Sequence, residues 1–241
     1  TKTNSKLMVV GDDFQSIYRF TGCDLSLFID FKKYFKNSKI MKIQNTYRNS
    51  QELINIAGSF VMKNKKQIYK DLKSSKHINK PINIIYYKNI KNTFIKIINK
   101  IYNETNKPIM ILGRNNNDIN KLIDNNLLIK ENDRIIYTEN KDIIMNYLTV
   151  HKSKGLESDN VVIINLENKL LGFPCGIKDS KLLRFVSKNN EKYVFAEERR
   201  LFYVALTRTK NKVYLLTPYN NESIFIKELI KDYKNKIKID K

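Results

Sequence analysis

The sequence of 241 residues contains no tryptophan and has only two cysteines, two histidines, four prolines and seven glycines. Cys23 and Cys175 cannot form the disulfide framework of a small secreted protein, and the absence of a Cys-x-x-Cys pair argues against a structural zinc site. No apolar run approaches the ~18 residues of a transmembrane helix, and there is no signal peptide. We therefore expect a cytoplasmic protein. Because the chain begins with Thr1 and not Met, we also expect that an upstream segment has been removed.

A phosphate-binding loop of the G-x-x-x-x-G-K-[ST] type is also missing, because none of the seven glycines is followed by lysine. Gly172 and Gly176 flank Phe, Pro and Cys, which indicates a turn and not a phosphate cradle. This chain alone therefore lacks the loop that holds nucleotide phosphates in most ATPases.

Positive charge is abundant. Lys and Arg number 45 against 24 Asp and Glu, which gives a net charge of +21. Polyanions are natural partners of such a chain. Lys, Asn and Ile are plentiful throughout, however, as a genome-wide bias would make them, so basicity alone does not establish nucleic-acid binding. The hydrophobic fraction of 41% is enough for a sizeable core.

Short apolar runs alternate with helical patterns along the chain. Helices are predicted after Asp24 and Ser50 and at 94–102, 116–126, 197–208 and 224–233, and strands at 7–10, 41–43, 82–87, 109–112, 147–150, 161–166 and 213–216. This alternation predicts an α/β fold with a mainly parallel sheet. Polar segments follow the predicted strands at Val10, Ile43, Leu112 and Val150, and the carboxyl ends of parallel strands form ligand crevices. We therefore expect these segments to converge on one crevice.

The stretch 197–208, EERRLFYVALTR, has helical periodicity with Leu201, Val204 and Ala205 on one apolar face. Arg208 continues that face, so its guanidinium must emerge at an interface or point at an anion. The plainer alternative is that Arg208 neutralises the helix C-terminus and that Glu197 and Arg200 pair on a solvated face.

Four blocks in fixed order resemble motifs III, IV, V and VI of the UvrD/Rep-type superfamily 1 DNA helicases: GDDFQSIYRFTGCD at 11–24, NTYRNS at 45–50, TVHKSKGLE at 149–157 and EERRLFYVALTR at 197–208. The first block and the compact spacing resemble the helicase IV-type members in particular. The resemblance implies a RecA-like three-layer domain, the second motor domain, at 45–241, preceded by the tail end of the first RecA-like domain at 1–44. Only about thirty residues follow Arg114 before motif V, too few for the large subdomain that many relatives insert there.

The resemblance implies that ATP binds between the two RecA-like domains. The phosphate loop and the Mg²⁺ ligands of the family would lie upstream of residue 1, so no metal ligand is expected in this chain, and Asp12 and Asp13 are expected to shape their loop.

In the family, residues of these motifs complete the nucleotide site: Arg208 as arginine finger, Arg48 and Gln15 at the γ-phosphate, Tyr47 stacked on adenine and Glu157 at the ribose hydroxyls. The plainer alternatives are a surface arginine, a glutamine in a turn, a core tyrosine and a first-turn helix acid.

The same resemblance implies DNA contacts. Phe20 corresponds to an aromatic residue that stacks on a base, Arg19 lies beside it, and Thr149 and His151 correspond to positions that touch the phosphodiester backbone. Stacking ignores sequence, which suits a translocase. The alternatives are a buried Phe20 and a His151 ring that is satisfied within its own loop.

The most direct functional prediction is the C-terminal part of an ATP-dependent helicase that moves 3′ to 5′ on single-stranded or partly duplex DNA. Without the phosphate loop and Mg²⁺ ligands, this chain alone should not hydrolyse ATP. One alternative is a non-catalytic helicase-like module that docks on a polymerase or on a repair or transcription protein. A simple basic nucleic-acid-binding domain would fit the charge, but it would not explain Arg48 and Arg208.

Overall fold

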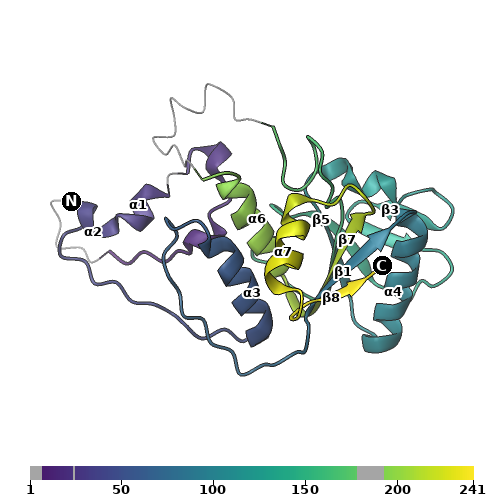
Figure 1. Cartoon of the computed structure of the whole chain (residues 1–241), viewed down its shortest axis with the longest axis horizontal. Coiled ribbons are helices and arrows are strands. Elements are labelled where there is room, and N and C mark those ends of the chain that lie inside the picture. The colour runs from purple at the N-terminus through teal and green to yellow at the C-terminus, as the bar shows by residue number, and fades with distance from the viewer. Residues whose placement is uncertain (1–6, 24, 178–192) are drawn as a thin grey trace.

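The computed structural model describes residues 7–23, 25–177 and 193–241. Its main element is one eight-stranded sheet with helices packed around it (Figure 1). The strand order is β3-β4-β5-β2-β6-β7-β1-β8. Strands β5, β2, β6, β7, β1 and β8 run parallel, and the hairpin β3–β4 adds an antiparallel edge. The strands are β1 (Ile82–Tyr87), β2 (Ile109–Gly113), β3 (Leu128–Glu131), β4 (Arg134–Tyr137), β5 (Met145–Thr149), β6 (Ser158–Ile163), β7 (Thr209–Pro218) and β8 (Lys238–Asp240).

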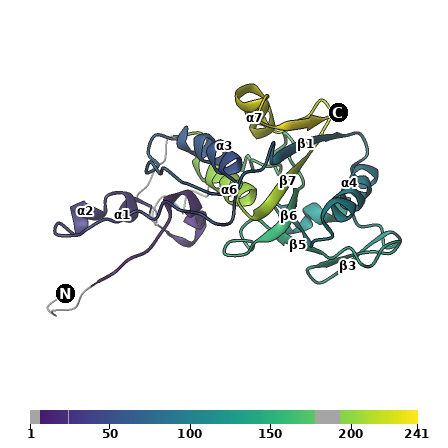
Figure 2. The ribbon, with the colours of Figure 1, turned by 90° about the horizontal axis from the view of Figure 1, so that it is seen from below.

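Helices cover both faces of this sheet, so the domain has three layers. Figure 2 shows α3, α6 and α7 on one side of the strands and α4 on the other. The helices are α1 (Ser26–Ile29), α2 (Phe31–Tyr34), α3 (Gln51–Met62), α4 (Ile90–Thr105), α6 (Ala196–Leu206) and α7 (Ile224–Tyr233), with 3₁₀ turns η1 (Asp13–Gln15), η2 (Arg19–Thr21) and η3 (Asn116–Lys121). The α/β fold with a mainly parallel sheet is therefore confirmed.

The two cores follow from the alternation of side chains along each strand. In β7, Val213 and Leu215 point into the core under α3, α6 and α7. Their neighbours Tyr214 and Leu216 point into the core under α4. Strands that are buried on both faces read as continuous apolar runs, which is why they were visible in the sequence. Ser50 caps α3 as predicted, because its hydroxyl accepts from the backbone N–H of Leu53 at 3.3 Å.

The N-terminal arm, which comprises residues 7–23 and 25–43, departs from the sequence prediction. Among the described residues, neither 7–10 nor 41–43 lies in a strand, and Met8, Met41 and Ile43 are strongly exposed. An apolar run becomes a strand only when a neighbouring strand satisfies its backbone groups, and no strand of the sheet lies beside this arm. The next residues pack well, since Phe14 and Ile17 are buried in the core that contains α3 and α6.

Two further boundaries differ from the sequence prediction. The predicted helix at 116–126 is the short turn η3, followed by the β3–β4 hairpin, which the sequence analysis missed. The helix predicted over 197–208 ends at Leu206, so Arg208 lies beyond it and directly before β7. The predicted apolar face is confirmed, because Leu201, Val204 and Ala205 are buried.

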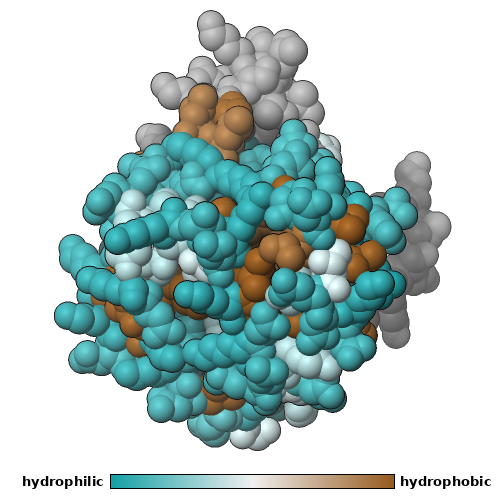
Figure 3. Space-filling model, turned by 90° about the vertical axis from the view of Figure 1, so that its right-hand side faces the viewer, coloured by the Kyte–Doolittle hydropathy of each residue, from teal (hydrophilic) through white to brown (hydrophobic). Residues whose placement is uncertain are grey.

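The surface reflects the composition. On the side shown in Figure 3, hydrophilic residues cover most of the surface and hydrophobic patches are small and separate. Over the described part of the chain, no helix combines the length and the apolar character that crossing a membrane requires.

Candidate functional site

The segment 150–157 runs from one end of the sheet to the other. β5 and β6 both pair in parallel with β2, one on each side. The segment leaves β5 directly after Thr149 at the carboxyl end of the sheet and enters β6 at the amino end. It therefore spans the full length of the strands, with His151 near its first end and Glu157 at its last residue. We use "amino end" and "carboxyl end" below for these two ends of the parallel strands.

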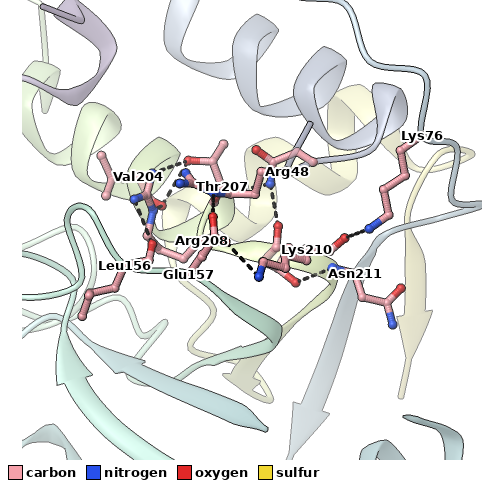
Figure 4. Close-up of polar contacts among 11 residues, drawn as sticks. Arg48, Lys76, Leu156, Glu157, Val204, Thr207, Arg208, Lys210 and Asn211 are labelled. Atoms are coloured by element: carbon pink, nitrogen blue, oxygen red, sulfur yellow. Dashed lines mark hydrogen bonds and ion pairs between the residues drawn. The ribbon is translucent and has the colours of Figure 1, made fainter. Parts of the chain in front are cut away.

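At the amino end, Arg208 is buried among neutral oxygen atoms (Figure 4). Its Nε donates to the Val204 carbonyl at 3.0 Å, one terminal nitrogen donates to the Leu156 carbonyl at 3.2 Å, and the other donates to the Thr207 hydroxyl at 3.4 Å. Burial and then the nearby charge of Arg48 lower the pKa of Arg208 to about 10. The group therefore stays protonated at neutral pH, and its hydrogen-bond partners are all neutral, while the carboxylates of Asp12 and Glu157 act on it only from a distance. Such a group favours the approach of an anion.

Beside Arg208, the carboxylate of Glu157 bridges two other cations. Arg48 Nε donates to one oxygen at 2.6 Å, and Lys210 Nζ lies 2.8 Å from the other (Figure 4). The hydrogen bond from Lys210 and then that from Arg48 lower the pKa of Glu157 to about 2. Glu157 directly precedes β6, so it is not the first-turn helix acid of the plainer alternative. The side-chain amide of Asn49 fixes the Arg48 loop by donating to the carbonyls of Thr207 and Thr209.

Tyr47 projects into solvent next to this cluster, with 87% of its surface exposed. The core-tyrosine alternative is therefore wrong, and the ring is free to act as a stacking surface.

Gln15 reaches the amino end from the N-terminal arm. Its amide donates to Asp12 at 2.6 Å, and Lys70 pairs with both Asp12 and Asp13. Asp13 also accepts from the backbone N–H of Ile68. A lysine between the two carboxylates occupies the place a cation would take, so the pair does not fit a Mg²⁺ site. It orders the loop, as predicted.

Residues 12–19 run alongside α6, from the amino end to the carboxyl end. Phe14 packs edge-on against Tyr203 near the helix C-terminus, with ring centroids 5.1 Å apart. Arg200 donates to the Ser16 carbonyl at 2.7 Å, and Glu197 accepts from the backbone N–H of Arg19 at 3.0 Å. The two charged side chains thus bind residues 16 and 19, and the plainer alternative of a Glu197–Arg200 pair on a solvated face is wrong. An 11-residue helix is ~16 Å long, so α6 is a rigid link between the two ends.

At the carboxyl end, Thr149 is buried at the last position of β5 and its hydroxyl accepts from the backbone N–H of Lys152. The ring of His151 lies 6.0 Å from the Tyr18 ring, and the Tyr18 hydroxyl donates to the His151 carbonyl at 2.9 Å. Burial, with a smaller contribution from Arg114, lowers the pKa of His151 to about 4, so the ring is neutral at pH 7. The side chain of Phe20 lies outside the described part of the structure.

Arg114 is a residue of this end to which the sequence analysis gave no role. It follows β2 directly, and its Nε and one terminal nitrogen donate to both oxygens of Glu198 at 2.8 to 3.1 Å. Glu198 also accepts from the backbone N–H of Cys175. Arg114 therefore joins β2, the start of α6 and the 164–177 loop. The signal was available, since Arg114 follows a predicted strand and Glu198 opens a predicted helix, but nothing in the sequence paired them.

The predicted residues thus form two clusters at opposite ends of the sheet, and the expectation of one crevice at the carboxyl end is wrong. Arg48, Glu157 and Arg208 meet at the amino end, which Gln15 and Tyr47 flank. Thr149, His151 and Arg19 lie toward the carboxyl end. Parallel strands have two ends, and the 150–157 segment and α6 each reach both of them.

Comparison with known proteins connects these clusters to a family. Residues 1–36 match the UvrD/REP helicase N-terminal domain, and residues 125–220 match the UvrD-like helicase C-terminal domain. These matches relate the chain to the UvrD/Rep-type helicases. The match at both ends of the chain, in this order, agrees with the four motifs found in the sequence.

Individual curated proteins that are similar to this chain are also helicases. DNA helicase IV of Escherichia coli (strain K12) is 29% identical over 233 residues, which cover 96% of this chain and 32% of that protein. ATP-dependent DNA helicase Rep of Buchnera aphidicola subsp. Schizaphis graminum is 36% identical over 110 residues, 46% of this chain and 17% of that protein. The chain therefore spans about a third or less of these relatives.

A solved structure has a similar fold. The C-terminal domain of a possible DNA helicase from Lactobacillus plantarum WCFS1 superposes with a TM-score of 0.50 over 81% of this chain and 99% of that one, at 13% sequence identity.

Proposed function

We propose that this chain is the C-terminal motor part of an ATP-dependent DNA helicase or translocase that acts in the cytoplasm. The observation that carries the proposal is the cluster at the amino end of the sheet. Arg48, Glu157 and Arg208 are far apart in sequence, and the fold brings them together. Two guanidinium groups beside a carboxylate and an exposed aromatic ring provide groups for the phosphates, ribose and base of a nucleotide.

Arg208 is the arginine finger in this proposal. A delocalised cation stabilises the charge that spreads over the transferred γ-phosphoryl group. Arg208 suits this role because it is buried, protonated and bonded only to neutral oxygens within the described residues. Arg48 and Gln15 assist at the γ-phosphate, Tyr47 stacks on the adenine and Glu157 accepts from the ribose hydroxyls.

The carboxyl end is the DNA side. Thr149 and His151 contact the phosphodiester backbone, and Arg19 and Phe20 lie beside a base. A neutral His151 can still donate one ring N–H to a phosphate. The net charge of +21 favours a polyanion. We propose single-stranded or partly duplex DNA as the ligand and movement from 3′ to 5′.

Two elements can transmit a change from one end to the other. The 150–157 segment and α6 with its bound arm each contact both ends. We propose that a shift at Arg208 or Glu157 on ATP binding is transmitted to His151 and Arg19 through these two elements.

Hydrolysis needs groups that this chain lacks. The sequence has no phosphate-loop lysine, and Asp12 and Asp13 are held by Lys70. ATP and its Mg²⁺ would therefore be held mainly by an upstream domain, and the isolated chain should have no ATPase activity.

The test is ATP hydrolysis and strand separation by the full-length protein, with and without single-stranded DNA, on duplexes that carry either a 3′ or a 5′ tail. We expect DNA-stimulated hydrolysis, unwinding of the 3′-tailed duplex only, and no hydrolysis by the isolated chain. A full-length protein that binds a polymerase or repair protein tightly but neither hydrolyses ATP nor binds DNA would contradict the proposal and favour a docking module.

A further inference from the structure

The contact between Arg48 and Glu157 competes with the roles proposed for both residues in the ATP-bound state. Arg48 Nε lies 2.6 Å from one Glu157 oxygen, and Lys210 Nζ lies 2.8 Å from the other. A ribose hydroxyl therefore competes with Arg48 for its carboxylate oxygen, while the γ-phosphate, two phosphate groups away, attracts the Arg48 guanidinium. Both effects favour separation of the pair when ATP binds.

We propose that the Arg48–Glu157 pair is a latch that ATP opens, and that Lys210 is the positioning residue that keeps Glu157 in place when Arg48 leaves. This inference rests on the proposed function. When the latch opens, the γ-phosphate takes Arg48 and the ribose hydroxyls take the place of Arg48 on Glu157. Each bond that breaks is replaced by one that forms, so both halves of the nucleotide are needed.

Lys210 suits the positioning role because its contact with Glu157 does not depend on Arg48. It binds the Glu157 oxygen that Arg48 does not use, at 2.8 Å. It also lies at the start of β7, where Thr209 donates to the Asp159 carbonyl and so ties this strand to β6. Figure 4 shows Lys210 and Arg48 reaching Glu157 from different elements. Loss of Arg48 therefore leaves the carboxylate anchored from the β7 side.

The latch makes a specific prediction about ligand selection. Inorganic tripolyphosphate can bind Arg48 but has no hydroxyl group that donates a hydrogen bond to Glu157. 2′,3′-Dideoxy-ATP has the base and the phosphates but lacks both ribose hydroxyls, so it also leaves Glu157 unpaired. The pair is partly exposed, and ion pairs of this kind change an equilibrium by about fivefold at most. We therefore expect ATP to bind about fivefold more tightly than dideoxy-ATP.

The experiment measures dissociation constants of ATP, dideoxy-ATP and tripolyphosphate on the full-length protein with Mg²⁺, by calorimetry, for the wild type, Glu157→Gln and Lys210→Met. With Glu157→Gln the latch is absent, so tripolyphosphate should bind about fivefold more tightly and the preference for ATP over dideoxy-ATP should shrink toward one. With Lys210→Met that preference should also shrink, because Glu157 is no longer held for the ribose.

Each variant has a control that changes the same charge nearby. Asp159→Asn removes one negative charge two residues from Glu157, and Lys212→Met removes one positive charge from the strand that carries Lys210. Lys212 pairs with Glu104 at 3.6 Å instead. A general electrostatic effect would appear in the controls as well, and a purely structural effect would not alter the ratio of the ATP and dideoxy-ATP constants.

The outcomes separate the latch from the proposed function. If the wild type binds ATP but Glu157→Gln gains no more tripolyphosphate affinity than Asp159→Asn, the latch is wrong and the proposed function stands. The assignment of Lys210 is wrong if Lys210→Met keeps the wild-type preference for ATP. Failure of the wild type to bind ATP would overturn both the proposed function and the latch.

Discussion

Two arginine–glutamate pairs lie at opposite ends of one sheet, and their surroundings differ. At the amino end, a single nitrogen of Arg48 contacts Glu157, and the side chains are 30% and 36% exposed. At the carboxyl end, Arg114 binds both oxygens of Glu198, and the side chains are 21% and 12% exposed. The third arginine, Arg208, is buried and has no carboxylate partner among the described residues, and its pKa is lowered. The pKa of Arg114 is raised instead, because Glu198 outweighs the effect of burial.

The two arginine–glutamate pairs are therefore suited to different roles, one to ligand binding and the other to holding the structure together. A bidentate, half-buried pair fixes two elements relative to each other, and breaking it leaves a desolvated charge. A single contact near water opens easily, and a buried cation with neutral partners favours an incoming anion. The amino end is therefore arranged to change its contacts when a ligand binds, and the carboxyl-end pair is arranged to keep them.

Arg208→Ala in the full-length protein should have the largest effect that distinguishes the two ends of the sheet. Removal of an arginine finger lowers turnover by about 10³-fold or more, because the γ-phosphoryl charge loses its stabilising cation. DNA affinity in the absence of nucleotide should be unchanged, since Arg208 lies at the other end of the sheet. Steady-state ATPase and fluorescence anisotropy with single-stranded DNA measure the two effects. The exposed hairpin residue Arg134 provides the control, and equal losses in Arg134→Ala would contradict the assignment.

Arg114→Ala should have the largest effect on stability. It leaves Glu198 desolvated, with the Cys175 N–H as its remaining hydrogen-bond partner among the described residues, and we expect the free energy of unfolding to fall by about 2–3 kcal/mol. Arg48→Ala at the exposed pair should cost less than about 1 kcal/mol. Urea denaturation of both variants tests the contrast, with Arg114→Ala/Glu198→Ala expected to recover part of the loss. Equal effects of the two arginine variants would remove the distinction between the ends.

Tyr47→Ala tests the nucleotide side without touching the core. Because the ring is almost fully exposed, stability should not change, while loss of stacking on adenine should weaken ATP binding about tenfold. Tripolyphosphate has no base, so its affinity should stay the same. Tyr69→Ala removes another exposed tyrosine and is the matched control. An unchanged ATP dissociation constant in Tyr47→Ala would show that the base binds elsewhere.

The smallest effect concerns pH and His151. Its pKa is near 4 in the folded protein and near 6.5 in the unfolded chain, so the unfolded chain binds the proton first as pH falls. His151 therefore leaves stability unaffected above pH 6.5 and lowers it progressively between pH 6.5 and 4, by about 1 kcal/mol at pH 5.5.

The measurement is urea denaturation at pH 7.5 and 5.5 for the wild type, His151→Asn and His77→Asn. His151→Asn should lose part of the pH dependence, whereas His77→Asn, which changes the chain's other histidine on the exposed surface beside Glu52, should retain it. The same pH dependence in His151→Asn and the wild type would show that the ring is not buried as a neutral group.

The sequence was sufficient for elements whose apolar side chains form the core. The mostly buried strands at 82–87 and 109–112 and the helix at 224–233, which buries one apolar face, appear where the apolar pattern predicted them. The strands expected at 7–10 and 41–43 failed because an apolar pattern does not reveal whether a neighbouring strand is present. The β3–β4 hairpin was missed because each strand has only four residues, too few to show a clear period beside the polar residues of the turn.

The candidate site shows the same division. Motif resemblance selected Arg48, Glu157 and Arg208 correctly as neighbours, although their roles remain predictions. It did not place them at the amino end of the sheet, because that depends on the 150–157 segment crossing the whole length of the strands. Nor could it pair Arg114 with Glu198 or Lys210 with Glu157, since such contacts depend on the relative position of elements and not on spacing along the chain.

The most direct test of a nucleotide end and a DNA end is hydrogen–deuterium exchange of the full-length protein, with a non-hydrolysable ATP analogue and with single-stranded DNA in separate experiments. We predict that the nucleotide slows exchange at 46–49, 156–158 and 207–210, and that DNA slows exchange at 18–21, 113–116 and 149–152. Protection of the first set by DNA alone, or of both sets equally by either ligand, would contradict the account.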